Sequence, residues 1–378
     1  MSSNSSQSSV LVLGGGILGV SSAVHLLREG AQVTLITDTK LASGASGRSL
    51  SWLNSAGERT KPYHDLRMAG VDRYRTLFSQ NPTLEWLRFD GGLFWDGNES
   101  STVTRHEYEL SHGYDSELVT PESVSAATPS IDSKTVADPS IFNPGEGWVS
   151  LPHLIDFLME EFHTLGGVLV EDAGKSSVTR DDEGVTGVST ANSGDYVATK
   201  VVVACGPQTP SVAAELGVYI GDASPVSMLV ITEKSEHGVQ AVLNTPRVAL
   251  RPNPGSTLAL DHDWYEPNIT QDGAGNYQIA ESVVNELVQE ASNVIAGNPI
   301  LKANNWKIGL KPIPGDGEPV FGELESVSGC YVVFTHSGAT LGLLAGELIS
   351  TEVLTGKRHP MLETFRPERF ALALNHSA

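Results

Sequence analysis

A glycine-rich turn between two apolar patterns constrains this chain most. The stretch VLVLGGGILGV covers residues 10–20, and its apolar run 10–13 predicts a fully buried strand. Apolar residues then recur at helical spacing over 17–29, and Gly30 is a stop signal for that helix. A second apolar run, AQVTLIT at 31–37, predicts another strand. Strand, turn, helix and strand within about thirty residues indicate one βαβ unit.

The glycines of this turn follow a G-x-G-x-x-G pattern at Gly14, Gly16 and Gly19. In a βαβ unit the first glycine permits the tight turn, the second lets the backbone approach a pyrophosphate, and the third lets helix and strand pack closely. The helix that begins at Ile17 offers unpaired N–H groups and a partial positive charge to phosphates. The motif therefore predicts a bound dinucleotide, and a glycine turn without a ligand is the alternative.

The end of the second strand is expected to carry an acidic residue for the ribose hydroxyls. Counting from Gly30, the expected position is Thr37, and Asp38 follows directly. The acid is therefore displaced by one position or replaced by a hydroxyl. Asp38 is a candidate ribose ligand, and a charge that caps the next turn is an equally good interpretation.

Length and charge limit the domain count and the classes of partner. A chain of 378 residues exceeds a single average core, so two domains are expected. Acidic residues outnumber basic ones, 45 to 24, and the formal net charge is −21. Such a surface repels phosphate backbones and anionic lipid, so neither nucleic acid nor a membrane is an expected partner. The sequence has no His/Cys cluster with zinc spacing, and no metal site is predicted.

The two cysteines and the N-terminal residues indicate the cellular compartment in which the protein is expected. Cys205 and Cys330 lie far apart in the sequence, which fits a reducing compartment better than a disulfide. The first residues, MSSNSSQSS, lack the basic start and apolar stretch of a signal peptide. No apolar run is long enough to span a bilayer. We therefore expect a soluble, cytoplasmic protein.

Further patterns are spread along the chain. Residues 153–172 predict an amphipathic helix, a Gly-Gly stop and a strand; 195–207 is a β-rich run; and 329–356 predicts strand, turn and helix. Between them, 85–145 and 215–310 are rich in β-formers, proline and glycine. These two stretches indicate inserted antiparallel β material.

Several stretches together resemble one family. The chain is similar to the D-amino-acid-oxidase-like family of FAD-dependent amine oxidoreductases, with glycine and sarcosine oxidases closest in pattern. The resemblance runs over nearly the whole length. Its stretches are LASGASGRSLSWLNSAG (41–57), RFDGGLFW (88–95), VVVACGPQTP (201–210), IGLKPIPGDGEPVFG (308–322) and THSGATLGLLAG (335–346). The last two are the most discriminating.

The resemblance implies an α/β fold, in which a Rossmann-like (GR2-type) FAD-binding domain carries an inserted antiparallel β-sheet substrate domain. The FAD-binding domain is expected to be discontinuous, over 10–84, 146–214 and 311–378. The substrate-binding domain is expected to take 85–145 and 215–310. Sarcosine oxidases attach flavin through a cysteine in the segment LKPIPGDG, which has none here. The FAD is therefore expected to be non-covalent.

Motif and resemblance together give a set of candidate cofactor residues. The turn 336–340 opens the last long helix, so its donors and dipole can face the flavin edge that becomes negative when hydride arrives. A plain helix cap is the alternative for this turn. The candidates are Gly14, Gly16, Ile17, Gly19, Thr37, Asp38, Ser46, Arg48, Ser49, Gly206, His336, Ser337, Gly338, Ala339 and Thr340.

Three residues are candidates for contact with the substrate. Trp52 corresponds to a family position beside the flavin face, where an aromatic ring can wall an apolar or cationic group; a core tryptophan is the alternative. Lys311 stands where glycine and D-amino-acid oxidases place a carboxylate-gripping arginine, but a lysine lacks the planar fork. It can pair with one carboxylate oxygen, lie near the flavin, or be solvated. His262 is a candidate base for an ammonium substrate, and a structural histidine is the alternative.

A second departure from the family lies in the stretch 247–264. Relatives carry a tyrosine before its proline, whereas this chain has Ala249, Leu250 and then Arg251. Sarcosine oxidases carry a lysine on the following strand, and none stands here. This departure and the lysine at position 311 both argue against glycine or simple D-amino acids as substrates.

We therefore predict an FAD-dependent oxidoreductase that oxidises the C–N bond of an amine or amino acid, preferably a secondary amine or substituted amino acid. The resemblance implies hydride transfer to flavin N5 and hydrolysis of the resulting imine, with molecular oxygen as one candidate electron acceptor. An FAD-dependent 2-hydroxy-acid dehydrogenase and a non-catalytic flavin-binding protein are the alternatives. The sequence leaves open the substrate, the choice between oxidase and dehydrogenase, and the oligomeric state.

Overall fold

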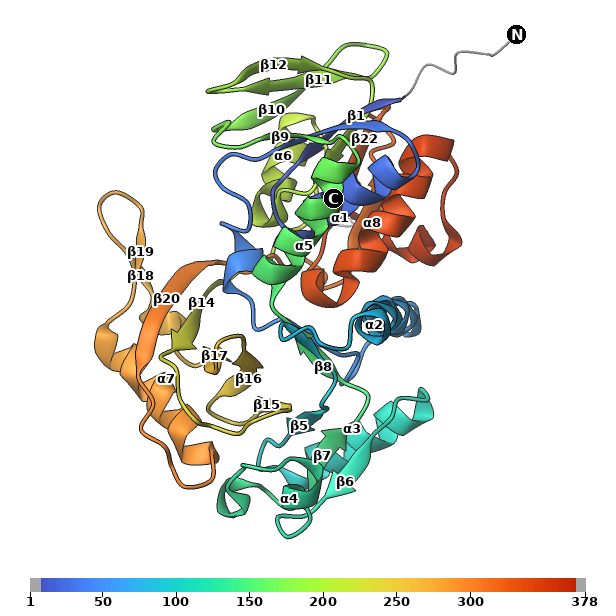
Figure 1. Ribbon diagram of the computed structural model, residues 1–378. Helices are drawn as coiled ribbons and strands as arrows, with labels where there is room; N and C mark the ends of the chain where they lie inside the picture. The colour runs from blue at the N-terminus through green and yellow to red at the C-terminus, as the bar shows by residue number, and fades with distance from the viewer. Residues whose placement is uncertain (1–7, 372–378) are drawn as a thin grey trace. The chain divides into compact units, whose positions relative to one another are not determined.

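The computed structural model describes residues 8–371, and the chain divides into two compact units (Figure 1). The first unit takes the chain up to Gly47, Leu151–Pro225 and the chain from Leu310 onward. The second takes Arg48–Ser150 and Val226–Gly309. The assignment of these segments to FAD binding and substrate binding remains a prediction.

A six-stranded sheet forms the centre of the first unit, in the order β21-β22-β13-β1-β2-β9. The central strands pair in parallel, and only β21 joins the sheet antiparallel. Most residues of the central strands are buried, as expected for parallel strands covered on both faces. The strands are β1 (Ser9–Leu13), β2 (Gln32–Ile36), β9 (Val168–Val170), β13 (Val201–Val203), β21 (Val320–Glu323) and β22 (Cys330–Phe334).

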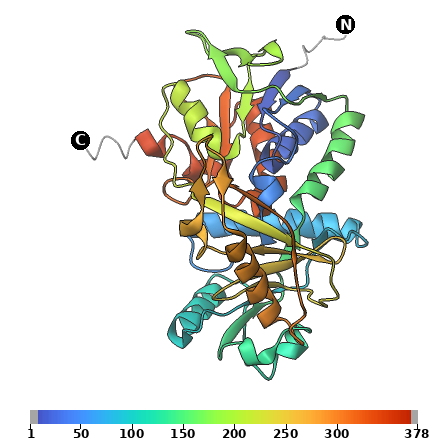
Figure 2. The ribbon, with the colours of Figure 1, turned by 90° about the vertical axis from the view of Figure 1, so that its left-hand side faces the viewer.

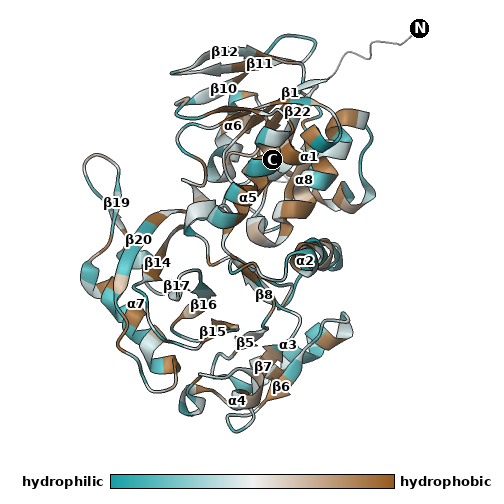
Figure 3. Ribbon diagram, viewed as in Figure 1, coloured by the Kyte–Doolittle hydropathy of each residue, from teal (hydrophilic) through white to brown (hydrophobic). Residues whose placement is uncertain are grey.

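Helix α1 (Ile17–Arg28) connects β1 to β2, so the structure contains the predicted βαβ unit. It packs against both α5 (Leu151–Thr164) and α8 (Gly338–Thr355) (Figure 1). A Cβ at Gly346 of α8 would lie only 2.6 Å from the backbone carbonyl carbon of Ser21, so glycine is needed for this close approach. Much of α8 is brown in Figure 3, in keeping with its burial.

The rest of the first unit is smaller. A short helix, α6 (Thr209–Glu215), follows β13 after a turn of 3-10 helix, η3 (Gly206–Gln208). A separate antiparallel sheet takes β10 (Ser176–Arg180), β11 (Val185–Thr190) and β12 (Gly194–Val197).

The second unit is built on an eight-stranded sheet in the order β20-β14-β17-β16-β15-β5-β7-β6. Its strands are β5 (Gly92–Phe94), β6 (Glu117–Val119), β7 (Ser140–Asn143), β14 (Val226–Thr232), β15 (Val242–Asn244), β16 (Ala249–Asn253), β17 (Thr257–Asp261) and β20 (Ala303–Leu310). The pair β15–β5 is parallel, and the antiparallel pairs on either side of it continue the sheet. The predicted α/β fold class with an inserted, mainly antiparallel sheet is thus confirmed.

Shorter elements complete the second unit. A small sheet takes β3 (Trp52–Leu53), β8 (Gly147–Val149) and β4 (Leu87–Arg88), and a hairpin takes β18 (Thr270–Gln271) and β19 (Tyr277–Gln278). The helices are α2 (Lys61–Gln80), α3 (Glu99–Ser111), α4 (Val124–Ala127) and α7 (Glu281–Val294).

Helix α7 covers one face of the eight-stranded sheet, and in Figure 2 it lies in front of the strands. Its buried residues Val284, Leu287, Val288 and Ala291 follow helical spacing. They join one apolar cluster with residues of the sheet. The burial of this stripe closes that face of the sheet.

Candidate active site

Most predicted cofactor residues of the first unit lie where its parallel strands end. Gly14 directly follows β1, Thr37 follows β2, and Gly206 comes three residues after β13. The turn 336–340 begins two residues after β22. Ligands of open α/β sheets bind outside the carboxyl ends of the strands. The chain therefore gathers these residues at the edge where a dinucleotide is expected.

The glycine turn forms a backbone cradle that a larger residue would fill. Gly14 has φ +115°, and a Cβ there would lie 2.2 Å from the carbonyl oxygen of Ala204. A Cβ on Gly19 would lie 1.9 Å from the carbonyl oxygen of Gly14. The N–H of Gly14 donates to the Ile36 carbonyl over 2.9 Å, which ties the turn to β2. This geometry fits the roles that the sequence gives to the first and third glycines.

The N-terminus of α1 carries no acidic residue in its first turn, and its N-cap Gly16 offers no side-chain cap. One helix donor is satisfied from a distant loop, because the N–H of Ile17 donates to Oγ of the buried Ser46 over 3.0 Å. A Cβ on Gly16 would lie 3.1 Å from the same Oγ. The positive end of the helix dipole is thus left without a negative side chain of its own, as an anion site requires.

Thr37 and Asp38 differ in accessibility. Thr37 is buried, its N–H donates to the Val170 carbonyl over 2.9 Å, and a Cβ on Gly15 would lie 2.9 Å from its Oγ1. Asp38 is exposed, and its Oδ1 accepts from the N–H of Thr39 over 2.9 Å. Of these two candidate side chains, only that of Asp38 is exposed.

The N-terminus of α8 lies at the same edge of the sheet. Its first turn contains no acidic residue, and the side chain of its N-cap, Ser337, makes no capping hydrogen bond. The N–H of Ser337 donates to Oγ1 of Thr335 over 3.0 Å, which fixes the turn after β22. Around Gly338 there is open space, since the nearest atom to an added Cβ is Leu18 Cδ1 at 4.0 Å.

Arg48 and Ser49 belong to the second unit, and Arg48 lies beside Gly309 of its β20. A Cβ on Gly309 of β20 would lie 2.5 Å from Cζ of Arg48, so this glycine leaves room for the guanidinium. Burial lowers the pKa of Arg48. The Oγ of Ser49 accepts from the N–H of Ser51 over 3.1 Å. These contacts fix the chain directly before Trp52.

Trp52 is held by a buried carboxyl group that the sequence analysis missed. Its Nε1 donates to Oε2 of Glu146 over 2.6 Å, and Oη of Tyr114 donates to Oε1 over 2.6 Å. Glu146 is 1 % exposed, and burial raises its pKa to about 8. A Cβ on Gly92 would lie 2.1 Å from Oε2, so glycine makes space for the carboxyl group. The only sequence signal was a glutamate between two glycines beside an apolar strand.

The hydrogen bonds continue from Tyr114 into a wider polar cluster. Its Oη accepts from the N–H of Ser55 over 2.9 Å, and Oγ of Ser55 lies 3.0 Å from Nδ1 of His64. His64 is buried, and burial lowers its pKa. The buried Arg67 donates to the carbonyl of Asn54 and to its side chain, both over 2.9 Å. Residues far apart in sequence form this cluster, so no local sequence motif predicts it.

Comparison with known proteins decides the family. The model of the DAO family, described as FAD dependent oxidoreductase, matches residues 9–351. The chain belongs to the DAO family. It is therefore an FAD-dependent oxidoreductase, and the resemblance stated from its motifs is confirmed.

Two curated relatives of this DAO protein match over nearly full length. The uncharacterized oxidoreductase YurR of Bacillus subtilis is 22 % identical, over 95 % of this chain and 98 % of the relative. A subunit of the opine oxidase of Agrobacterium tumefaciens is 21 % identical, over 95 % of this chain and 96 % of the relative. Among solved structures, glycine oxidase from Geobacillus kaustophilus has a TM-score of 0.79 at 19 % identity, over 95 % of this chain and 98 % of that one. The last match shows that the fold is shared.

The structure places the other two substrate candidates in different surroundings. Both ring nitrogens of His262 are engaged locally: Nε2 lies 3.2 Å from the Thr245 carbonyl and Nδ1 lies 2.7 Å from Oδ1 of Asp263. These contacts suit a structural histidine, so our proposals leave His262 out. Lys311 follows β20 directly, in the first unit, where its N–H donates to the Pro225 carbonyl over 2.8 Å.

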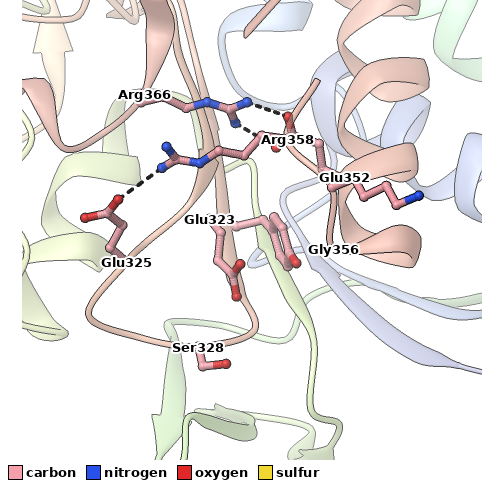
Figure 4. A pocket seen from close by; sticks show the side chains of 9 residues that line it. Glu323, Glu325, Ser328, Glu352, Gly356, Arg358 and Arg366 are labelled. Atoms are coloured by element: carbon pink, nitrogen blue, oxygen red, sulfur yellow. Dashed lines mark hydrogen bonds and ion pairs between the residues drawn. The ribbon is translucent and has the colours of Figure 1, made fainter. Parts of the chain in front are cut away.

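A pocket of about 470 Å³ in the first unit is not part of the candidate site (Figure 4). Tyr331 at the start of β22 and Glu352 near the end of α8 line it, whereas the candidate residues follow the end of β22 and open α8. Its charges largely pair with one another. Arg366 contacts Glu352 and Arg358 contacts Glu325. We assign it no ligand.

Three structural findings bear on the remaining expectations. Both cysteines are free, and burial raises the pKa of each thiol to about 12. Within residues 8–371, no group of three or more His, Cys, Asp or Glu side chains is arranged to hold a metal ion. In the same range, no helix has the length and apolar character needed to cross a membrane.

Proposed function

We propose that this protein oxidises the C–N bond of a secondary amine or a substituted amino acid. The observation that carries the proposal is the pair of helix N-termini, of α1 and α8, at the carboxyl edge of one parallel sheet. Neither has an acid in its first turn, and the two helices pack against each other. Two positive helix ends suit a ligand with a pyrophosphate and a ring that becomes negative on reduction.

The residues present fit FAD, and each has a role in this proposal. The turn from Gly14 to Gly19 holds the pyrophosphate, and Asp38 binds the adenosine ribose. The N-terminus of α8 would supply N–H donors and partial positive charge to the part of the flavin that becomes negative on reduction. When bound, FAD supplies the acceptor for a hydride from the substrate carbon. Since only a neutral amine gives up hydride readily, the substrate ammonium must lose its proton first.

The substrate class rests on chemistry and on the names of relatives. The names opine oxidase and glycine oxidase describe amino-acid-like substrates of those proteins. Here Lys311 replaces the forked cation of glycine oxidases, and β16 carries Ala249, Leu250 and Arg251 before its proline, where relatives carry a tyrosine. A substrate larger than glycine, with a substituted nitrogen, suits these changes. Lys311 contributes a positive charge toward its acidic group.

Product analysis tests the reaction type. Oxidation of a secondary amine gives an imine, and its hydrolysis consumes one water and releases an amine and a carbonyl compound. Holoprotein incubated with N-methylglycine, iminodiacetate or a larger N-alkyl amino acid is expected to release both products in equal amounts. If the protein instead converts 2-hydroxy acids to keto acids and oxidises none of the amine substrates, it is a hydroxy-acid dehydrogenase. Bound FAD that no substrate reduces would establish a non-catalytic protein.

A further inference from the structure

Arg59, in the second unit, is a cation whose side chain has no partner in the protein. It directly precedes Thr60, the N-cap of α2. Its backbone is fixed from α3, because Oη of Tyr108 accepts from its N–H over 3.2 Å and donates to its carbonyl. The guanidinium, in contrast, makes no hydrogen bond or ion pair with any residue of 8–371, and its Nε is buried. All the donors of this group are therefore unused.

Two further arginines lie close to Arg59. Its Cζ lies 5.5 Å from the ring centroid of Tyr63, and Cζ of Arg67 lies 5.7 Å from the same centroid. Burial, followed by the positive charges of Arg67 and Arg105, lowers the pKa of Arg59 to about 10. Loss of hydration and repulsion between like charges both raise the free energy of this arrangement. An anion bound beside Arg59 would offset both costs.

The carboxylates of the adjoining helices are engaged with other cations. Oε1 of the buried Glu109 on α3 accepts from Nε of Arg105 over 2.9 Å. On α2, Asp65 pairs with Lys61. The exposed Glu58, which precedes the unpartnered arginine in the chain, forms no ion pair within the described residues. The charge that would balance this guanidinium must therefore come from outside the described part of the chain.

The surroundings of Arg59 suit a ligand that arrives from solvent. Its side chain is partly exposed, whereas that of Arg67 behind the same tyrosine ring contact is buried. Helix α2 has 20 residues, no acid in its first turn and no side-chain cap from Thr60. The helix end therefore adds partial positive charge to that of the arginines.

We propose that Arg59 is the centre of a phosphate-binding site on the second unit. A guanidinium forms paired hydrogen bonds with phosphate oxygens. Positive charge from two arginines and a helix end suits a dianion better than a singly charged carboxylate. The ligand is therefore a phosphate dianion, either free or as the monoester of a small molecule. This inference goes beyond the proposed function, because the ligand takes no part in the oxidation of an amine.

Calorimetric titration of the FAD-bound protein tests this inference without turnover. The titrants, at constant ionic strength, are inorganic phosphate, glycerol phosphate and acetate. The wild type is expected to bind at least one of the two phosphates more tightly than acetate. Tighter binding of inorganic phosphate would identify the free ion as the ligand, and tighter binding of glycerol phosphate would identify a monoester. Arg59→Met should weaken phosphate binding about tenfold or more, the loss of a charged hydrogen-bonding group.

Arg88→Met is the matched control. Arg88 is also partly exposed and lies over an aromatic ring, 5.6 Å from the centroid of Phe78, but it pairs with Asp90. This variant should bind phosphate as the wild type does. FAD content and thermal midpoint without phosphate are measured for every variant. If Arg59→Met does not fold, Arg59→Lys replaces it and should weaken phosphate binding severalfold, since lysine lacks the planar fork.

Three results would overturn the inference. The first is a wild type that binds neither phosphate, or binds acetate as tightly as phosphate. The second is wild-type phosphate affinity in the Arg59 variants. The third is displacement of phosphate by an N-alkyl amino acid, which would make this a substrate site. Failure to oxidise any amine would refute the proposed function and would leave the phosphate titrations unaffected.

Discussion

The indole Nε1 of Trp52 and the buried carboxyl group of Glu146 are joined by a hydrogen bond of 2.6 Å. Tyr114 donates to the other carboxyl oxygen, so the group is fixed from both sides. Because the carboxyl group comes from the residue before β8 while Trp52 lies on β3, the bond spans two strands of one small sheet. The orientation of the Trp52 ring therefore depends on Glu146, whose pKa is raised to about 8.

The first prediction concerns stability and pH. In the unfolded chain Glu146 releases its proton near the ordinary pKa of a glutamate, whereas the folded protein holds it up to about pH 8. Between these values the folded state binds one more proton, so stability falls as pH rises. Glu146→Gln removes this dependence. Its thermal midpoint, relative to the wild type, should rise between pH 5 and about pH 8, a difference worth a few kcal/mol.

The control for this prediction is Glu107→Gln on α3, an exposed glutamate. Its midpoint should follow that of the wild type at every pH. If the Glu146→Gln and wild-type curves run parallel across the range, Glu146 is not the group that titrates there.

The second prediction concerns the glycine turn. Gly19→Ala places a Cβ against the Gly14 carbonyl and forces α1 away from β1. Overpacking of this kind costs about 1–3 kcal/mol, and the displaced helix should bind FAD weakly. The ratio of flavin to protein absorbance after purification measures the loss. Gly273→Ala has open space around its Cβ and should retain full FAD content. Equal FAD content in both variants would refute the role of the turn.

The third prediction separates Asp38 from Thr37. Asp38→Asn removes the charge that is proposed to accept from the ribose hydroxyls, so FAD affinity should fall about tenfold, a typical cost for a charged hydrogen bond. Thr37→Val should change affinity less, because Thr37 is packed against the turn. Asp182→Asn, on an exposed turn of the same unit, is the control. Titration of the apoprotein with FAD measures all three, and an unaffected Asp38→Asn would assign this aspartate to the turn alone.

The fourth prediction concerns Lys311. Lys311→Met should slow reduction of the bound flavin by an acidic substrate, because one positive charge near that substrate is lost, while FAD stays bound. Lys307 is an exposed lysine on β20 and serves as the control. In the Lys307→Met variant, the bound flavin should be reduced at the wild-type rate. Rapid-mixing absorbance under anaerobic conditions gives both rates. Equal rates would remove Lys311 from the site.

Local patterns predicted the βαβ unit because the glycine spacing, the apolar run and the helical periodicity all lie within residues 9–36. The inserted sheet was also expected from composition, although the parallel pair β15–β5 was not, since the two strands are far apart in sequence. The polar cluster around Glu146 was missed for the same reason. Trp52, Tyr114 and Glu146 meet only after β3 and β8 have paired.

Arg251 shows a related limit. The sequence marked it only as a departure from the family, at a position where relatives differ. Its burial and its bond to the Leu50 carbonyl depend on the fold and have no local signature. His262 was a candidate because histidine can act as a base near neutral pH, but no sequence pattern revealed that the Thr245 carbonyl and Asp263 lie beside its two ring nitrogens.

Anaerobic reduction of the purified holoprotein tests the central claim most directly. The oxidised protein is mixed, without oxygen, with an N-alkyl amino acid, and the visible flavin band is followed. We predict that the band disappears with one equivalent of substrate and that one equivalent of the carbonyl product forms. A flavin band that persists with every amine tested, or a protein that takes up no FAD, would contradict it.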